Sequence, residues 1–170
     1  FVEKENITDS SAVLYGEDVK HISSVLRLRT GDEVMLCDGI GMDYRARITA
    51  ISKAEVHFDI LSSSTALTEP QCSLTLFQGL PKAGKLETII QKCVELGISE
   101  VVPVAMERSV VRLSKKDFGK KLERYQRVEM EASKQSRRGV IPRVGGLIEP
   151  KEIDPAAFDA LLLAYELESE

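Results

Sequence analysis

One strand-loop-helix-strand unit between residues 74 and 111 constrains the fold more than any other part of the chain. Residues 74–78 and 100–105 are short apolar segments, which is typical of buried strands. Five apolar residues between them follow the spacing of one helix face: Leu86, Ile89, Ile90, Cys93 and Val94. Gly97 is placed to end that helix. Strands joined by a crossover helix lie parallel, so the unit predicts an α/β domain that binds ligands beyond the carboxyl ends of its strands.

Residues 1–61 follow a different pattern. Three strand candidates lie at 33–37, 44–51 and 55–61 and are joined by short turns, after a further strand at 1–4 and a helix at 16–28. This order predicts a small antiparallel β-barrel or a curled antiparallel sheet. Because the serine-rich segment 62–71 has the composition of a linker, we predict two domains, 1–66 and 67–170.

The C-terminal third of the sequence predicts one long helix and one strand. The helix begins at Ser114 and ends near Arg138, and its buried line is formed by Phe118, Leu122, Tyr125, Val128 or Glu129, and Ala132. The segment 158–165 contains three consecutive leucines, which favours a central parallel strand buried on both faces.

Charge is distributed unevenly along the chain. The net charge is −4, but residues 108–143 hold twelve Lys or Arg against four Asp or Glu, a local charge of +8 that leaves −12 for the remainder. An acidic protein with one basic segment is suited to bind a polyanion there. The alternative is a long solvated helix whose basic residues bind no partner.

Several classes of protein are disfavoured by composition. No apolar run is long enough to span a membrane, and the chain start has no signal-peptide pattern, so we expect a cytoplasmic protein without a membrane partner. The two histidines are far apart in the sequence, and we therefore expect no metal site.

The loop from Gly79 to Lys85 matches most of a phosphate-binding loop but lacks its last residue. Leu86 replaces the Ser or Thr that would hold magnesium, and Pro81 removes a backbone donor, so nucleotide hydrolysis is disfavoured. A helix start beside Lys82 and Lys85 is still suited to bind an anion such as an RNA phosphate.

Other candidate residues lie in three places. Arg27 and Arg29, with Arg45 and Arg47, are suited to form a phosphate-binding edge, and His21 nearby has either a structural or a functional role. Arg108 follows a strand at its carboxyl end, and Gln135 and Arg138 lie at the end of the long helix.

These stretches together resemble the RsmE-type 16S ribosomal RNA uridine N3-methyltransferases of the α/β-knot (SPOUT) class. The resemblance covers nearly the whole chain and rests on the order and spacing of four groups: His21 with Val25-Leu26-Arg27 and Gly31-Asp32, Lys82–Lys92 with Glu95-Leu96-Gly97, Glu107-Arg108-Ser109, and Glu131-Ala132 with Gln135-Ser136 and Arg138.

The resemblance implies a PUA-like RNA-binding domain followed by a methyltransferase domain that uses S-adenosylmethionine. Such an enzyme acts as a homodimer on a uridine of 16S rRNA in the small ribosomal subunit. The family holds its cofactor in a C-terminal knot with a Gly-Pro-Glu-Gly-Gly-like loop and a Leu-Gly-x-Arg loop, and this sequence contains neither. We therefore expect the chain to be the N-terminal two-thirds of the enzyme, with the cofactor site beyond residue 170.

Uracil N3 carries a proton, so its methylation needs a base or a positive group that stabilises the uracilate anion. For this role the first candidate is Arg108, followed by Lys92 and Glu95. The residues expected to position RNA are His21, Arg27, Arg29, Lys82, Lys85, Gln135 and Arg138. The alternative is an RNA-binding or dimerising fragment that has no catalytic activity by itself.

Overall fold

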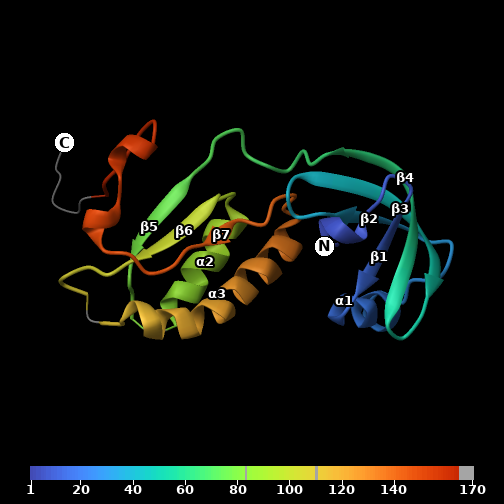
Figure 1. Ribbon diagram of the computed structural model, residues 1–170, viewed down its shortest axis with the longest axis horizontal. Helices are drawn as coiled ribbons and strands as arrows, with labels where there is room; N and C mark the ends of the chain where they lie inside the picture. The colour runs from blue at the N-terminus through green and yellow to red at the C-terminus, as the bar shows by residue number, and fades with distance from the viewer. Residues whose placement is uncertain (83, 110, 165–170) are drawn as a thin grey trace.

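Two sheets, each with its own hydrophobic core, form the N-terminal and C-terminal halves of the molecule (Figure 1). The structure is a computed structural model that describes residues 1–82, 84–109 and 111–164. The first sheet is antiparallel with strand order β1-β4-β3-β2, and the second is parallel with order β5-β6-β7. The predicted fold class, an antiparallel β domain followed by a parallel α/β domain, is confirmed.

Four strands build the N-terminal sheet: β1 (Ser11–Tyr15), β2 (Glu33–Cys37), β3 (Met42–Ile51) and β4 (Glu55–Thr65). The sequence predicts the last three but not β1. The strand predicted at residues 1–4 is wrong, because a 3-10 turn begins at Lys4. The Val2 N–H donates to the Cys37 carbonyl at 2.9 Å, so the N-terminal segment crosses from the β2 edge of the sheet toward the β1 edge.

The helix predicted at 16–28 is shorter in the structure. It consists of α1 (Glu17–Lys20) and a π-helical turn (His21–Val25). Arg27 has a left-handed backbone with φ of 55°, which an α-helix cannot contain. The helical segment therefore ends before Arg27.

The first four residues of the serine-rich segment predicted as a linker are strand. Residues 62–65 continue β4 and pair with residues 42–45 of β3. Their side chains are exposed, so a polar sequence is compatible with the sheet there. The connection between the two sheets is consequently confined to residues 66–74.

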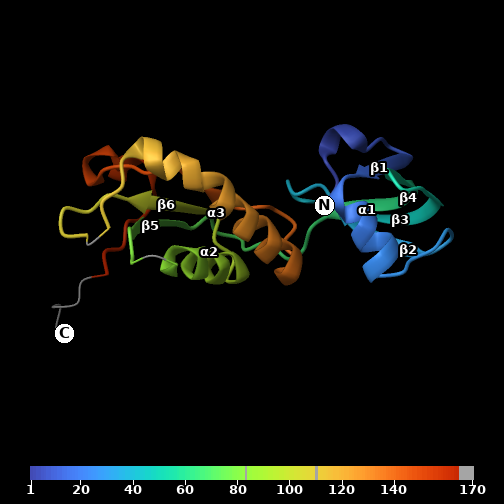
Figure 2. The same cartoon turned by 90° about the horizontal axis from the view of Figure 1, so that it is seen from below.

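The C-terminal sheet contains β5 (Thr75–Gly79), β6 (Glu100–Val104) and the short β7 (Arg143–Val144), joined by α2 (Lys85–Glu95) and α3 (Lys115–Ser136). β5 and β6 are parallel, as predicted. The two helices pack against each other, and their apolar faces share one core with β6 and β7 (Figure 2). Ser114 caps α3 by accepting a hydrogen bond from the Asp117 N–H at 3.1 Å, which confirms the predicted start of this helix.

Gly97 follows α2 with φ of 97°, in the left-handed region that the sequence predicts for it. A Cβ at this position would lie 2.6 Å from the Pro70 ring. Glycine therefore lets the segment between the domains pack directly against the end of α2.

The central strand predicted at 158–165 is wrong for its described part. Residues 158–164 form no strand, and Leu161, Leu162 and Leu163 are exposed, whereas Tyr165 lies outside the described residues. A strand buried on both faces needs neighbouring strands and covering helices, and this segment has neither within the described chain. Among the described residues, no helix combines the length and apolar character needed to cross a membrane.

The two domains meet where the β2–β3 turn contacts the segment after α3. An antiparallel bridge joins Ile40 to Val140 and is flanked by two backbone hydrogen bonds of 3.0 and 2.9 Å. On α3, Lys134 donates to Asp18 of α1 at 2.8 Å. These contacts define the junction between the domains.

One acidic side chain of α3 is buried against the sheet. Glu129 is only 6% exposed, and its Oε2 has no hydrogen-bond partner among the described residues. The sequence leaves Val128 and Glu129 as alternatives on the buried line, and the structure buries Glu129 more deeply. Burial raises the pKa of Glu129 to about 7, although a hydrogen bond from the Val144 N–H favours the ionised form.

We expect Glu129→Gln to raise the free energy of unfolding by about 2 kcal/mol at about pH 8 and to change it little at about pH 4. The folded-state pKa lies above the ordinary value of 4.5, so the folded protein binds this proton more tightly and loses stability as pH rises from 4.5 to about 7. Gln keeps an oxygen acceptor and cannot ionise. Urea unfolding at both pH values measures the effect.

The control for this experiment is Glu131→Gln, which changes an exposed acid of the same helix. It should leave the difference in stability between the two pH values as it is in the unchanged protein. If the free energy of unfolding changes between the two pH values by the same amount in the Glu129→Gln protein as in the unchanged protein, ionisation of Glu129 has no cost in the folded state.

Candidate functional site

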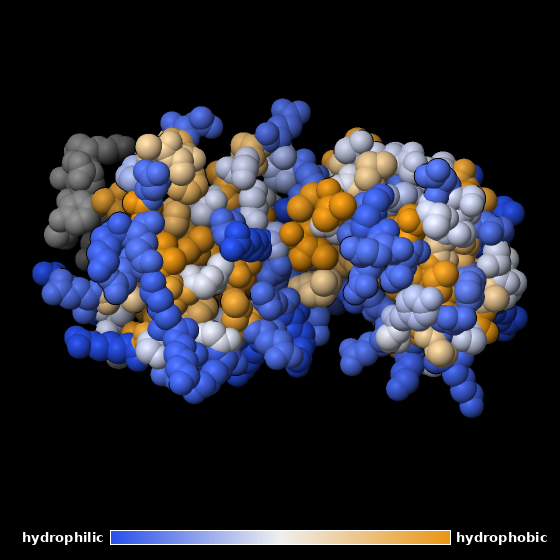
Figure 3. Space-filling view, viewed as in Figure 1, coloured by the Kyte–Doolittle hydropathy of each residue, from blue (hydrophilic) through white to orange (hydrophobic). Residues whose placement is uncertain are grey.

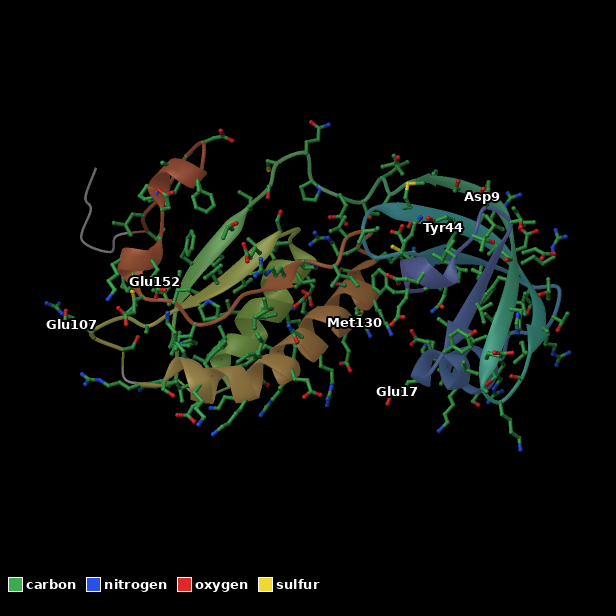
Figure 4. All side chains as sticks on the ribbon, viewed as in Figure 1. Asp9, Glu17, Tyr44, Glu107, Met130 and Glu152 are labelled. Atoms are coloured by element: carbon green, nitrogen blue, oxygen red, sulfur yellow. The ribbon has the colours of Figure 1, made fainter. Side chains whose placement is uncertain are left out.

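The carboxyl ends of β5 and β6 lie at the same edge of the parallel sheet, and each leads through a loop to a helix. Figure 4 shows Glu107 at the far tip of the second loop, where its side chain points into solvent. The neighbouring Arg108 is also exposed and forms no ion pair within the described part of the chain. Arg108 therefore lies at the end of the sheet where the sequence predicts it, with its charge available to a ligand.

A small pocket of about 180 Å³ lies beside the start of α2. Lys82, Leu86, Lys121, Arg124 and Tyr125 are among its lining residues. Arg124 is fixed by a 2.9 Å hydrogen bond from its Nη2 to Glu87, whereas Lys82 and Lys121 form no ion pair among the described residues. With helix N–H groups and two available cations nearby, this pocket is suited to a phosphate-sized anion.

This pocket does not fit S-adenosylmethionine. Sites for ligands of that size usually have volumes of about 300 Å³ or more. The lining cations Lys82, Lys121 and Arg124 would also repel a positively charged sulfonium. The α2 pocket is therefore not a site for this cofactor.

Two of the predicted catalytic residues lie away from this edge of the sheet. Lys92 and Glu95 are near the C-terminal end of α2, about 10 to 15 Å along the helix axis from its start. The Lys92 Nζ donates to Glu95 at 2.7 Å, and this hydrogen bond lowers the pKa of the Glu95 carboxyl. Within one chain the structure therefore does not bring Lys92 and Glu95 together with Arg108.

The predicted RNA-positioning residues are divided between two surfaces. Lys85 is exposed on the first turn of α2, close to Lys82. His21, Arg27 and Arg29 are exposed on the N-terminal domain, and His21 lies beside the junction between the domains. Arg45 and Arg47 share one exposed face, as predicted, but both approach Glu33, at 3.7 and 2.8 Å.

Gln135 and Arg138 differ sharply in exposure although both lie at the end of α3. Gln135 is exposed, whereas Arg138 is only 5% exposed. The Arg138 Nη1 donates to the Val94 and Ile98 carbonyls at 3.0 and 3.1 Å, and Nε and Nη2 donate to Glu69. The predicted RNA contact of Arg138 does not fit this burial, because its N–H groups are used inside the protein.

The Glu69 carboxylate also accepts hydrogen bonds from the Gly139 and Val140 N–H groups, at 2.7 and 3.0 Å. Burial opposes ionisation of Glu69, but the bonds from Arg138 and the two amides outweigh it and hold the pKa of Glu69 below its usual value. The segment between the domains is thereby fixed to the ends of both helices.

Sequence reasoning missed Lys121, Arg124 and Glu69. The first two are three residues apart in the basic helix, and their spacing alone could have placed them on one face. Glu69 has no such signal, because it lies in a polar segment before Pro70 that reads as an ordinary linker.

Known proteins support this architecture over most of the chain. A family model described as an RNA methyltransferase domain matches residues 68–170, and one described as an RNA methyltransferase PUA domain matches residues 14–61. The two matches together describe a class of protein in which a PUA domain is followed by an RNA methyltransferase domain. The chain belongs to this RNA methyltransferase family.

A ribosomal RNA small subunit methyltransferase E from Bacillus subtilis (strain 168) is 35% identical over 153 residues, which cover 89% of this chain and 60% of that protein. A crystal structure of a ribosomal RNA small subunit methyltransferase E from Neisseria gonorrhoeae, bound to S-adenosyl methionine, is similar with a TM-score of 0.73 and 32% identity. The match covers 85% of this chain and 59% of that one. The chain thus spans about three-fifths of the length of these relatives.

We expect Arg138→Lys to lower the free energy of unfolding by about 2 to 4 kcal/mol. A lysine ammonium cannot reach Glu69 and the carbonyls of Val94 and Ile98 together, so it leaves buried polar groups without partners. Urea unfolding followed by circular dichroism measures the change. The matched control is Arg143→Lys, because Arg143 is 79% exposed and approaches Glu100 at 3.5 Å, and we expect a change within about 0.5 kcal/mol. Equal losses in the two variants would overturn the structural role of Arg138.

Proposed function

We propose that this chain comprises the RNA-binding domain and the first part of the catalytic domain of an S-adenosylmethionine-dependent methyltransferase that modifies N3 of a uridine in 16S rRNA. The observation that carries this proposal is the succession of a PUA match and an RNA methyltransferase match along one chain. The names of the relatives support the small ribosomal subunit as substrate. The choice of uridine N3 rests on the family resemblance of the sequence.

The structure supports a charge-stabilising role for Arg108 in this reaction. Loss of the N3 proton leaves negative charge on the uracil oxygens until N3 accepts the methyl group, and a guanidinium can stabilise that charge by donating charge-assisted hydrogen bonds to one of these oxygens. Arg108 lies in an exposed turn at the carboxyl edge of the sheet and has no ion-pair partner among the described residues. Its charge is therefore available to the substrate.

The remaining exposed cations are suited to hold RNA by its phosphates. Lys82 and Lys85 lie at the start of α2, and His21, Arg27 and Arg29 lie on the N-terminal domain. Gln135 adds an amide at the end of α3. Two separated groups of phosphate ligands would fix the direction in which an RNA strand crosses the protein.

We further propose that the whole protein acts as a homodimer in the cytoplasm, where it meets the small ribosomal subunit. Dimerisation follows from the family resemblance, and the cytoplasmic location follows from the proposed rRNA substrate.

A second candidate function is RNA binding by this chain without catalysis. The specific observation in its favour is that the α2 pocket does not fit S-adenosylmethionine. Incubation of small-subunit rRNA with tritiated S-adenosylmethionine separates the candidates. We expect N3-methyluridine only with a protein that extends beyond residue 170. Methyl transfer by the 170-residue chain would overturn the fragment interpretation, and a different methylated position in the longer protein would overturn the N3 assignment.

In the longer protein, we expect Arg108→Ala to lower kcat by about 100-fold and to weaken rRNA binding by less than about threefold. The physical reason is that the uracil oxygens gain negative charge only when N3 loses its proton for the reaction, and not when the RNA binds. Single-turnover kinetics and filter binding measure the two quantities separately. The control is Arg112→Ala, an exposed arginine of the same loop. If Arg108→Ala weakened binding as much as turnover, Arg108 would be a phosphate ligand only.

A further inference from the structure

A cavity of about 520 Å³ lies between the N-terminal domain and the C-terminal end of α3. One wall comes from residues 18–28, which include the helical segment, and from β2, and the other comes from Thr68 and the last turn of α3. Figure 2 shows the end of α3 facing the α1 segment across this space, and Figure 3 shows the notch between the two domains on one face. We call this space the junction cavity.

The wall on the N-terminal domain is mainly apolar. Leu26 and Met35 line it and are 53% and 63% exposed, which is high for large apolar side chains. Leu28 and Val34 extend the same wall, and Asp43 and Thr68 add polar atoms able to bond to a ligand. The cavity is thus an apolar slot with a few polar groups, which is the usual character of a site for a small organic group.

Basic residues lie along the rim of the junction cavity. Arg137 lines the cavity on the α3 side, and on the other side Lys20, Arg27 and Arg29 are each next in sequence to a residue that lines it. None of these four forms an ion pair within the described ranges. Of the two lining carboxylates, Asp18 is paired with Lys134 at 2.8 Å, and Asp43 has no ion-pair partner there. Four unpaired cations against one unpaired carboxylate favour an anion at the rim.

Backbone conformations that are unfavourable for ordinary residues also gather at this cavity. Arg27 and Arg137, on opposite sides, are the non-glycine residues with positive φ, at 55° and 56°, in the described chain. The π-helical turn His21–Val25 forms part of the same rim. Strained residues and π-helical turns cluster at functional sites more often than elsewhere.

We propose that the junction cavity binds one unpaired nucleotide of a single-stranded RNA segment, with the base in the apolar slot and the adjacent phosphates on the rim. This inference rests on the proposed function, because it assumes an RNA substrate. Single-stranded RNA is recognised by taking an unstacked base into an apolar site while cations hold its backbone. A volume of about 520 Å³ admits one nucleotide, and the positive rim favours RNA over an apolar protein segment.

Photocrosslinking tests the location of the base. The probe is a single-stranded RNA of about ten nucleotides with one 4-thiouridine, and the readout is mass spectrometry of crosslinked peptides. We expect crosslinks within residues 21–36 or 133–138. Crosslinks confined to the start of α2 or to residues 111–127 would overturn the proposal.

Affinity measurements test whether the base and the rim both contribute. Replacement of the crosslinking nucleotide by an abasic one should weaken binding by about tenfold or more, whereas a contact with the backbone alone would change it little. Arg137→Asn should weaken binding of the intact RNA by about threefold to tenfold, because Asn tolerates the left-handed backbone but removes the charge. The matched control is Arg127→Gln, which removes an exposed cation of α3 outside the cavity and should have a smaller effect.

These results are separable from the proposed function. If the longer protein methylates rRNA but neither the abasic change nor Arg137→Asn weakens binding, the cavity proposal is wrong and the function stands. If the RNA binds in the cavity but no methyl group is transferred by the longer protein, the cavity proposal stands and the function is wrong. Equal binding of a short peptide and of the RNA at the cavity would show a protein-docking site instead.

Discussion

The ion pair between Glu69 and Arg138 connects three parts of the chain that are far apart in sequence. Removal of two charges from water costs several kcal/mol, and that cost is recovered only when the hydrogen bonds of both groups are satisfied. Here the Arg138 guanidinium donates to Glu69 and to the carbonyls of Val94 and Ile98 at the end of α2, and Glu69 accepts from the amides after α3. The helices, the inter-domain segment and the junction therefore share one set of bonds. A shift of any of these parts would leave a buried charge without partners.

This arrangement explains why the inter-domain segment is short and well defined despite its polar sequence. Pro70 packs against Gly97, and Ala66 fills the space left by Gly139, so the segment contacts the ends of both helices. A flexible linker would allow the two domains to rotate relative to each other. The bonds to Glu69 instead fix the position of the N-terminal domain, and with it the shape of the junction cavity.

The sequence predicts those parts of the fold that depend on local pattern. Periodicity locates α2, and the capping residue Ser114 locates the start of α3, because both effects act within a few residues. The strand predicted at 158–165 fails because three consecutive leucines show only that the segment is apolar. Whether such a segment becomes a buried strand depends on neighbours that the described chain does not provide.

The same limit applies to the candidate site. Exposed Arg108 and Lys82 are found from the sequence because their positions follow from where strands and helices end. Arg138 is the opposite case, since its position in a basic segment suggests a nucleic-acid contact and only the tertiary structure shows its acidic partner 69 residues away. The charge pattern of a sequence shows where cations lie along the chain, but it does not show which of them form ion pairs in the folded protein.

The end of α3 shows how one local constraint determines both an internal and an external contact. Arg138 reaches the α2 carbonyls only if the chain turns sharply after Ser136, and the left-handed Arg137 provides that turn. Glycine is the residue favoured in this conformation, and another residue there costs about 1 kcal/mol. A cation beside the C-terminal end of a helix recovers part of this cost through the helix dipole. The turn that directs Arg138 into the protein thus places Arg137 at the rim of the junction cavity, where its charge is available to RNA.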